Sequence, residues 1–239
     1  MNIVIISPGD FIDEHRVRLT GRRFEHISKV HRAHKNTLLK VGLIDGLKGS
    51  GTVLGIDSDS ITLHVTLNCA PLKPLPLTLL LALPRPKMLK RILQSVASLG
   101  VKEIYLINSY KVEKSYWSSP VLTESSINEH LQLGLEQAGD TISCNVYLYK
   151  RFKPFVEDQL AAIVKDSQKI LAHPYDAIPI EHYSVQDRKK TILAIGPEGG
   201  FIDYEVQHLQ QLGFTPVSLG ERILRVETAI PYTIAKLFN

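Results

Sequence analysis

The sequence contains 2 cysteines among 239 residues, and Cys69 and Cys144 lie far apart and form no Cys-x-x-Cys pair. This scarcity argues against a disulfide scaffold and a zinc site, and it is typical of proteins from a reducing compartment. No apolar run approaches the roughly 18 residues that a membrane-spanning helix requires. The longest run, Leu75–Leu83, has the length of a strand. We therefore expect a globular protein with neither disulfides nor membrane spans.

Signals for secretion, metal binding and hydrolysis are also missing. Met1–Ile6 has no basic flank and no small-residue cleavage site, which a signal peptide requires. The 9 histidines show no metal-ligand spacing such as His-Glu-x-x-His. Ser7, Ser95 and Ser218 lack the Gly-x-Ser-x-Gly context of a hydrolase nucleophile. We expect a cytoplasmic protein that needs no metal and no membrane.

Positive charge is concentrated in one N-terminal stretch. The formal net charge of the chain is +4, yet residues 14–40 carry eight Lys and Arg side chains against two glutamates. Such a patch attracts phosphates, and added salt weakens that attraction. The pattern therefore favours nucleic-acid binding, although a solvated helix and loop that happen to be basic remain an alternative. The candidate nucleic-acid contacts are Arg16, Arg22, Arg23, Lys29, Arg32 and Lys35.

Residues 1–70 are predicted to form a small β-rich domain. Strands separated by turn residues are expected at Ile3–Ile6, Arg16–Thr20, Leu38–Asp45, Gly51–Asp57 and Ser60–Leu67. Apolar residues at helical spacing predict a helix within Arg22–Lys35. Pro71, Pro74 and Pro76 then prevent a regular helix or strand, so we place a linker there and a second domain at residues 75–239.

The second domain alternates strands with helices. Strands are expected at Leu77–Leu83, Ile104–Ile107, Val146–Tyr149, Lys169–Ala172, Thr191–Ile195 and Pro216–Leu219. Helices are expected at Pro86–Leu99, Ser125–Ala138, Asp203–Leu212 and Val226–Phe238, with Asp203 as an N-cap. This alternation predicts an α/β fold with a parallel sheet covered on both faces, in which ligands bind beyond the carboxyl ends of the strands.

The loop Ile195-Gly196-Pro197-Glu198-Gly199-Gly200-Phe201 follows one predicted strand. Its three glycines allow close approach of the backbone to a ligand and positive φ angles. The following helix presents free N–H groups to whatever lies there. The pattern favours a ligand-binding turn, and a tight strand-to-helix connection is the alternative.

The segment Leu219-Gly220-Glu221-Arg222-Ile223-Leu224-Arg225-Val226-Glu227-Thr228-Ala229 follows the last strand. Its apolar pair can pack on a flat ring, and Arg225 can clamp a phosphate or orient a base through its planar fork. Alternatively, Arg222 and Arg225 form ion pairs with the neighbouring glutamates, and such pairs contribute little to stability. Spacing alone does not separate the two interpretations.

Together, these two loops resemble the signature of the ribosomal RNA small subunit methyltransferase E family of the SPOUT superfamily. The likeness extends over nearly the whole chain, with weaker matches at His26–Arg32 and Glu136–Ala138. It implies a SPOUT-type α/β domain with a C-terminal trefoil knot, preceded by a small PUA-like β-barrel that binds RNA. It further implies a homodimer that uses S-adenosylmethionine to methylate N3 of a uridine in small-subunit (16S) ribosomal RNA.

The resemblance also implies roles for particular residues. Arg225 is the candidate for stabilising a developing uracil anion, and Glu198 is a second catalytic candidate that could instead contact the cofactor or the dimer partner. The implied cofactor contacts are Leu171, Ala172, His173, Ile195, Gly196, Pro197, Glu198, Gly199, Gly200, Leu219, Gly220, Ile223, Leu224 and Arg225.

Two segments depart from the family's usual pattern. Asn108–Lys114 stands where a Ser-Glu-Arg segment is usual, and Gly139-Asp140 stands where Gly-Arg is usual. The cofactor loops are kept, whereas these two segments, which are candidates for facing RNA, differ. The alternatives are therefore a SPOUT methyltransferase with another RNA target and a non-catalytic RNA-binding ribosome-assembly factor.

Overall fold

The computed structural model describes residues 2–185 and 189–238, which form two compact units. The first unit comprises the chain up to Lys73 together with Gln132–Ser143, and the second comprises the rest. The sequence placed Gln132–Ser143 in the second domain, whereas the structure groups this segment with the first. Within the described ranges, no helix has both the length and the apolar character that a membrane span requires.

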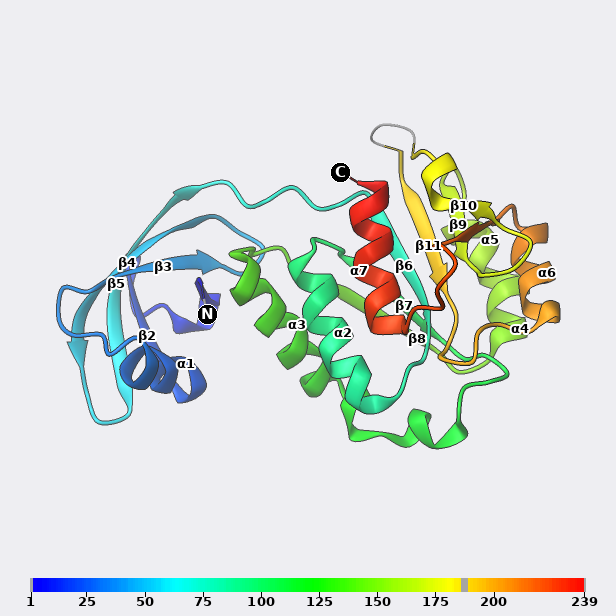
Figure 1. The fold of residues 1–239 in the computed structure, drawn as a ribbon. Coiled ribbons are helices and arrows are strands. Elements are labelled where there is room, and N and C mark those ends of the chain that lie inside the picture. Colours follow the sequence, from blue (N-terminus) through cyan, green and yellow to red (C-terminus); the bar gives the residue numbers. More distant parts are fainter. Residues whose placement is uncertain (1, 186–188, 239) are drawn as a thin grey trace. The chain divides into compact units, whose positions relative to one another are not determined.

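The first unit is built on a five-stranded sheet with the order β1-β3-β4-β5-β2 (Figure 1). Its strands are β1 (Val4–Ile6), β2 (Arg16–Thr20), β3 (Leu38–Leu43), β4 (Lys48–Ile56) and β5 (Ser60–Cys69). β1 runs parallel to β3, and the other pairs are antiparallel. All five predicted strands are confirmed. In β2 the side chains alternate between an exposed and a buried face, as the period of a strand requires. The fully buried face includes Val17, Leu19, Val41, Val53, Ile61 and Leu63.

The predicted helix of this unit is shorter than expected. α1 spans Gly21–Glu25 and continues as a π-helical turn over His26–Val30. The prediction ran to Lys35, but Arg32 adopts a positive φ of 48°. A left-handed residue cannot continue a right-handed helix, so the chain leaves the helix there.

The segment Gln132–Ser143 is joined to the rest of the first unit by a partly buried ion pair and by backbone hydrogen bonds. Nη1 of Arg22 donates to Oε2 of Glu136 at 2.9 Å, and Glu136 is 1% exposed. The backbone N–H of Asp45 donates to the carbonyl of Thr141 at 2.8 Å. Arg22 therefore connects two parts of the chain that are far apart in sequence.

The second unit contains a seven-stranded sheet with the order β10-β12-β9-β11-β6-β7-β8, in which all pairings are parallel. Its strands are β6 (Leu77–Ala82), β7 (Glu103–Ile107), β8 (Asn145–Tyr149), β9 (Gln168–Ala172), β10 (Ile178–Pro179), β11 (Thr191–Ile195) and β12 (Thr215–Ser218). The expectation of an α/β fold with a parallel sheet is confirmed. Sequence analysis missed β10, which has two residues at the sheet edge and thus no periodicity to detect.

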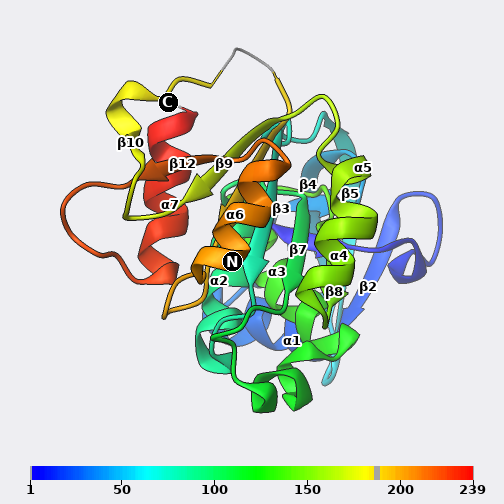
Figure 2. The ribbon, with the colours of Figure 1, turned by 90° about the vertical axis from the view of Figure 1, so that its right-hand side faces the viewer.

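Helices cover both faces of this sheet. The helices of the second unit are α2 (Pro86–Ser98), α4 (Phe152–Phe155), α5 (Ala161–Ile163), α6 (Asp203–Gln211) and α7 (Val226–Leu237). α3 (Glu124–Ala138) begins in this unit, and from Gln132 onward it belongs to the first. Figure 1 shows α2 and α7 on one face and α4, α5 and α6 on the other, and Figure 2 looks onto the second face. The helical segment from Phe152 to Ile163 was not predicted. The N-cap of α6 is Ile202, so the prediction of Asp203 was wrong by one residue.

Strand β11 lies between β6 and β9, and β12 pairs with the far side of β9. Parallel strands end at the same edge of a sheet. The chain order therefore brings the loops that follow β9, β11 and β12 next to one another.

We predict that Arg22→Ala lowers the free energy of unfolding by roughly 2–4 kcal/mol, because it leaves the Glu136 carboxylate buried without its guanidinium. Chemical denaturation measures the loss. Lys29→Ala is the matched control, since Lys29 lies 3.5 Å from Glu25 and its side chain is 74% exposed. An exposed pair of this kind contributes about 0–1 kcal/mol. Equal losses in the two variants would contradict the prediction.

Candidate functional site

The three neighbouring loops enclose a cavity of about 480 Å³ in the second unit. Residues 195–202, 219–224 and 172–175 form its walls, and the first turns of α6 and α7 close it. The chemistry of the lining is mixed, because apolar side chains alternate with backbone groups of a glycine-rich turn. Such a cavity suits a small molecule that has both a flat apolar part and polar groups.

Most of the residues predicted to contact a cofactor line this cavity. They are Ala172, His173, Ile195, Gly196, Pro197, Glu198, Gly199, Gly200, Leu219, Gly220, Ile223 and Leu224. Leu171 is fully buried within β9, where it packs in the sheet instead of facing the cavity. Arg225 is exposed and forms the N-cap of α7, where its carbonyl accepts from the N–H groups of Thr228 and Ala229.

Sequence reasoning missed several residues that line the cavity. They are Lys111, Pro174, Tyr175, Phe201, Ile202, Asp203, Arg222, Val226 and Ala229. Phe201, Arg222, Val226 and Ala229 stand within the two predicted loop segments but were not among the predicted contacts. Pro174, Tyr175, Ile202 and Asp203 extend the predicted segments 171–173 and 195–201 by one or two residues. Lys111 comes from a different loop, after β7, and only its position beyond the end of a strand pointed to it.

The glycines of the 196–200 turn are required by the turn itself. A Cβ on Gly196 would lie 2.9 Å from the backbone N of Phe201, which is too close for any side chain. Gly200 has a φ of 71°, and its N–H closes the turn by donating to the carbonyl of Pro197 at 2.8 Å. The tight connection and the ligand-binding turn are thus compatible interpretations of one structure.

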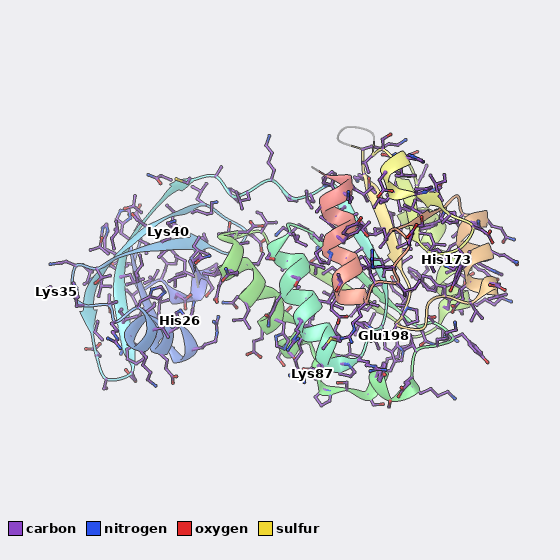
Figure 3. All side chains as sticks on the ribbon, viewed as in Figure 1. His26, Lys35, Lys40, Lys87, His173 and Glu198 are labelled. Atoms are coloured by element: carbon purple, nitrogen blue, oxygen red, sulfur yellow. The ribbon has the colours of Figure 1, made fainter. Side chains whose placement is uncertain are left out.

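Glu198 projects from this turn toward the start of α2. Its Oε1 accepts from the backbone N–H of Arg85 at 3.2 Å and lies 4.0 Å from Nε of the same arginine. The side chain of Glu198 is 31% exposed, so solvent screens this pair. Figure 3 shows both Glu198 and His173 in the second unit. Glu198 therefore ties the glycine turn to the N-terminus of a helix.

His173 supplies an ionisable ring to the cavity lining. Its backbone N–H donates to the carbonyl of Val217, and its ring stands edge-on to Tyr175 with centroids 5.8 Å apart. Burial lowers the pKa of His173 below its usual value of 6.5, and the carboxylates of Asp203 and Asp176 oppose this shift. The imidazole is therefore neutral near pH 7.

The predicted nucleic-acid contacts of the first unit divide into two groups. Arg22 is held by Glu136, and Arg23 donates to the carboxylate of Asp10 with its side chain 21% exposed. Both arginines thus have a carboxylate partner within the fold, and their contact with nucleic acid stays a prediction. Arg16, Lys29, Arg32 and Lys35 are exposed, as is Arg22, whose side chain is 41% exposed. Of these, Arg16 pairs with Asp13 and Lys29 with Glu25 at the surface, and Figure 3 labels Lys35.

We predict that Gly200→Val lowers the free energy of unfolding by about 1–2 kcal/mol, since a β-branched residue tolerates left-handed φ poorly. No atom lies within 4 Å of a Cβ added at this position, so the effect comes from the backbone alone. Gly200→Asn is the matched control, because asparagine tolerates this conformation better. Denaturation curves compare the variants. Equal losses would show that the backbone conformation is not the cause.

Comparison with known proteins connects this geometry to a family. A family model described as an RNA methyltransferase domain matches residues 71–237. The chain is 30% identical over 233 residues to ribosomal RNA small subunit methyltransferase E of Treponema pallidum, covering 96% of this chain and 87% of that protein. It is 25% identical over 243 residues to ribosomal RNA small subunit methyltransferase E 1 of Borreliella burgdorferi, covering 100% of both.

A solved structure shares the fold. It is ribosomal RNA small subunit methyltransferase E from Neisseria gonorrhoeae bound to S-adenosyl methionine, with a TM-score of 0.77 and 20% identity. The match covers 98% of this chain and 96% of that one. The similarity thus extends through both units of the chain.

Proposed function

Because this chain belongs to the ribosomal RNA small subunit methyltransferase E family, we propose that it transfers a methyl group from S-adenosylmethionine to N3 of a uridine in 16S ribosomal RNA. The observation that carries the proposal is the cavity at the ends of β9, β11 and β12. Both loops of the family signature, 195–201 and 219–229, contribute to its walls.

The residues of the cavity fit this cofactor. Its volume of about 480 Å³ lies within the range of roughly 300–1,000 Å³ that is usual for small-molecule sites. Ile223 lines the cavity while its side chain is 70% exposed, so a bound flat ring would cover apolar surface there. The turn at 196–200 offers backbone N–H and C=O groups that can recognise the edge of a base. We assign adenine recognition to these two walls.

When bound, the sulfonium supplies an activated methyl group, and the protein must position the uridine in line with it. Uracil N3 carries a proton that must leave before the nitrogen can attack, so the site needs to stabilise negative charge. Arg225 is exposed at the N-terminus of α7, next to the cavity residues Leu224 and Val226. We therefore propose Arg225 as the cation that faces the uracil and stabilises its negative charge. Glu198 instead positions the glycine turn through Arg85.

The proposal includes a trefoil knot at the C-terminal end of the second unit. Its support is the strand order, since β11 enters between β6 and β9 and the chain then crosses to the far side of β9.

We also propose that the five-stranded first unit is the PUA-like, RNA-binding domain, with Arg16, Lys29, Arg32 and Lys35 facing phosphates. We propose a cytoplasmic homodimer, and exposed apolar side chains of Tyr175 and Ile223 beside the cavity support a partner there.

The substrate is tested in the organism that carries the gene. We expect mass spectrometry to detect N3-methyluridine in 16S ribosomal RNA, to lose it when the gene is deleted and to recover it when the gene is restored. Persistence of the modification after deletion would exclude the stated substrate. Calorimetric titration with S-adenosylmethionine tests the enzyme proposal separately, because a non-catalytic assembly factor would give no binding heat.

Cofactor binding should weaken as the pH falls through the lowered pKa of His173. The lowered pKa of His173 keeps its ring neutral at pH 7, and protonation below that pKa places a positive charge near a cationic cofactor. We expect a loss of affinity of about fivefold once the ring is protonated, at constant ionic strength. His173→Asn should flatten this dependence. An identical pH profile in both proteins would assign the effect to another group.

A further inference from the structure

The side chain of Lys111 lies across the glycine turn. Its Nζ donates to the carbonyl of Gly199 at 2.7 Å. A Cβ built on Gly199 would lie 2.9 Å from Cδ of Lys111 and 3.5 Å from its Cβ. The aliphatic stem of the lysine thus packs directly against the backbone at 199 and would have to move to admit a side chain there.

The loop that carries Lys111 is bonded to a buried carboxylate that lies outside the cavity. Glu205, which is 2% exposed, accepts from the hydroxyl of Ser109 at 3.1 Å and from the backbone N–H of Tyr110 at 2.8 Å. It also accepts from the N–H of Ile202 at the start of α6, at 3.1 Å. One carboxylate therefore fixes the loop after β7 to the helix that begins where the glycine turn ends.

These contacts form a chain from Glu205, through the loop at 109–111, to the carbonyl of Gly199. We propose that Lys111 is a positioning residue for the glycine turn, and that Glu205 acts through it by fixing the loop that carries it. This inference rests on the proposed function, because it assigns the turn the task of binding S-adenosylmethionine. Nothing in the signature loops themselves pointed to either residue.

The physical reason is the bond between an ammonium group and a peptide carbonyl. A hydrogen bond to a charged donor is stronger than a neutral one, and it orients the Gly199–Gly200 peptide. Glycine-rich turns have many accessible backbone conformations, so an unrestrained turn must be ordered when the ligand binds. A turn that is already ordered binds its ligand more tightly, because that entropic cost is met during folding.

The first test compares three variants by calorimetric titration with S-adenosylmethionine. Lys111→Met keeps the stem and removes the ammonium, and we expect the dissociation constant to rise about tenfold. Lys111→Arg should restore at least half of the lost binding free energy, because a guanidinium can donate to the same carbonyl. Lys114→Met is the matched control, since Lys114 is exposed in the same stretch and does not line the cavity. It should bind like the wild type.

The second test asks whether Glu205 acts through Lys111. Glu205→Gln replaces one acceptor oxygen with a donor, and the cofactor dissociation constant should rise although Glu205 makes no contact with the cavity. The double variant Lys111→Met/Glu205→Gln should lose little more binding free energy than the weaker-binding single variant, because both changes release the same turn.

Hydrogen exchange of residues 195–202 without ligand should speed up in both single variants. The melting temperature of Lys111→Met should stay near that of the wild type.

The outcomes separate this inference from the proposed function. If the wild type binds S-adenosylmethionine and Lys111→Met binds it equally well, Lys111 does not position the turn. Fully additive losses in the double variant would show that Glu205 acts by another route. If the wild type itself fails to bind, the proposed function is wrong, and the exchange rates at 195–202 still report whether Lys111 orders the turn.

Discussion

The pairing of β11 with both β6 and β9 is the constraint on which the rest of the second unit depends. All five residues of β11 are buried, so its register is fixed by two neighbours and by apolar packing on both faces. Since the sheet is parallel, this one insertion places the ends of β9, β11 and β12 side by side. The cavity exists because three loops far apart in sequence are forced to begin at the same edge.

The glycine turn must close tightly on itself and also leave its backbone groups accessible from the cavity. Its own closure needs Gly196 and Gly200, as the close approach to Phe201 and the positive φ show. Gly199 instead makes room for the stem of Lys111. A glycine-rich sequence next to a ligand cavity is thus not explained by the ligand alone. The same residues order the turn in the free protein and leave its backbone groups accessible from the cavity.

The basic N-terminal stretch shows why charge is an incomplete guide to binding. Arg22 and Arg23 stand among lysines and arginines in the sequence, yet each meets a carboxylate, from Glu136 and Asp10. The partner of Arg22 lies 114 residues away. Lys35 and Arg32 occupy the exposed end of the same stretch, and their charge remains available to phosphates. Composition alone therefore does not show which of these side chains pair with carboxylates of the protein itself.

The sequence by itself determined the class of fold, nearly every long strand and helix, and the two loops that line the cavity. These features depend on local periodicity, on glycine and on the order of elements, all of which can be read along the chain. Only the tertiary structure decided the roles of Lys111, Glu205, Arg22 and Gln132–Ser143. Each of these depends on a partner far away in the sequence, and local patterns contain no information about which distant residue will fill a given space or satisfy a given charge.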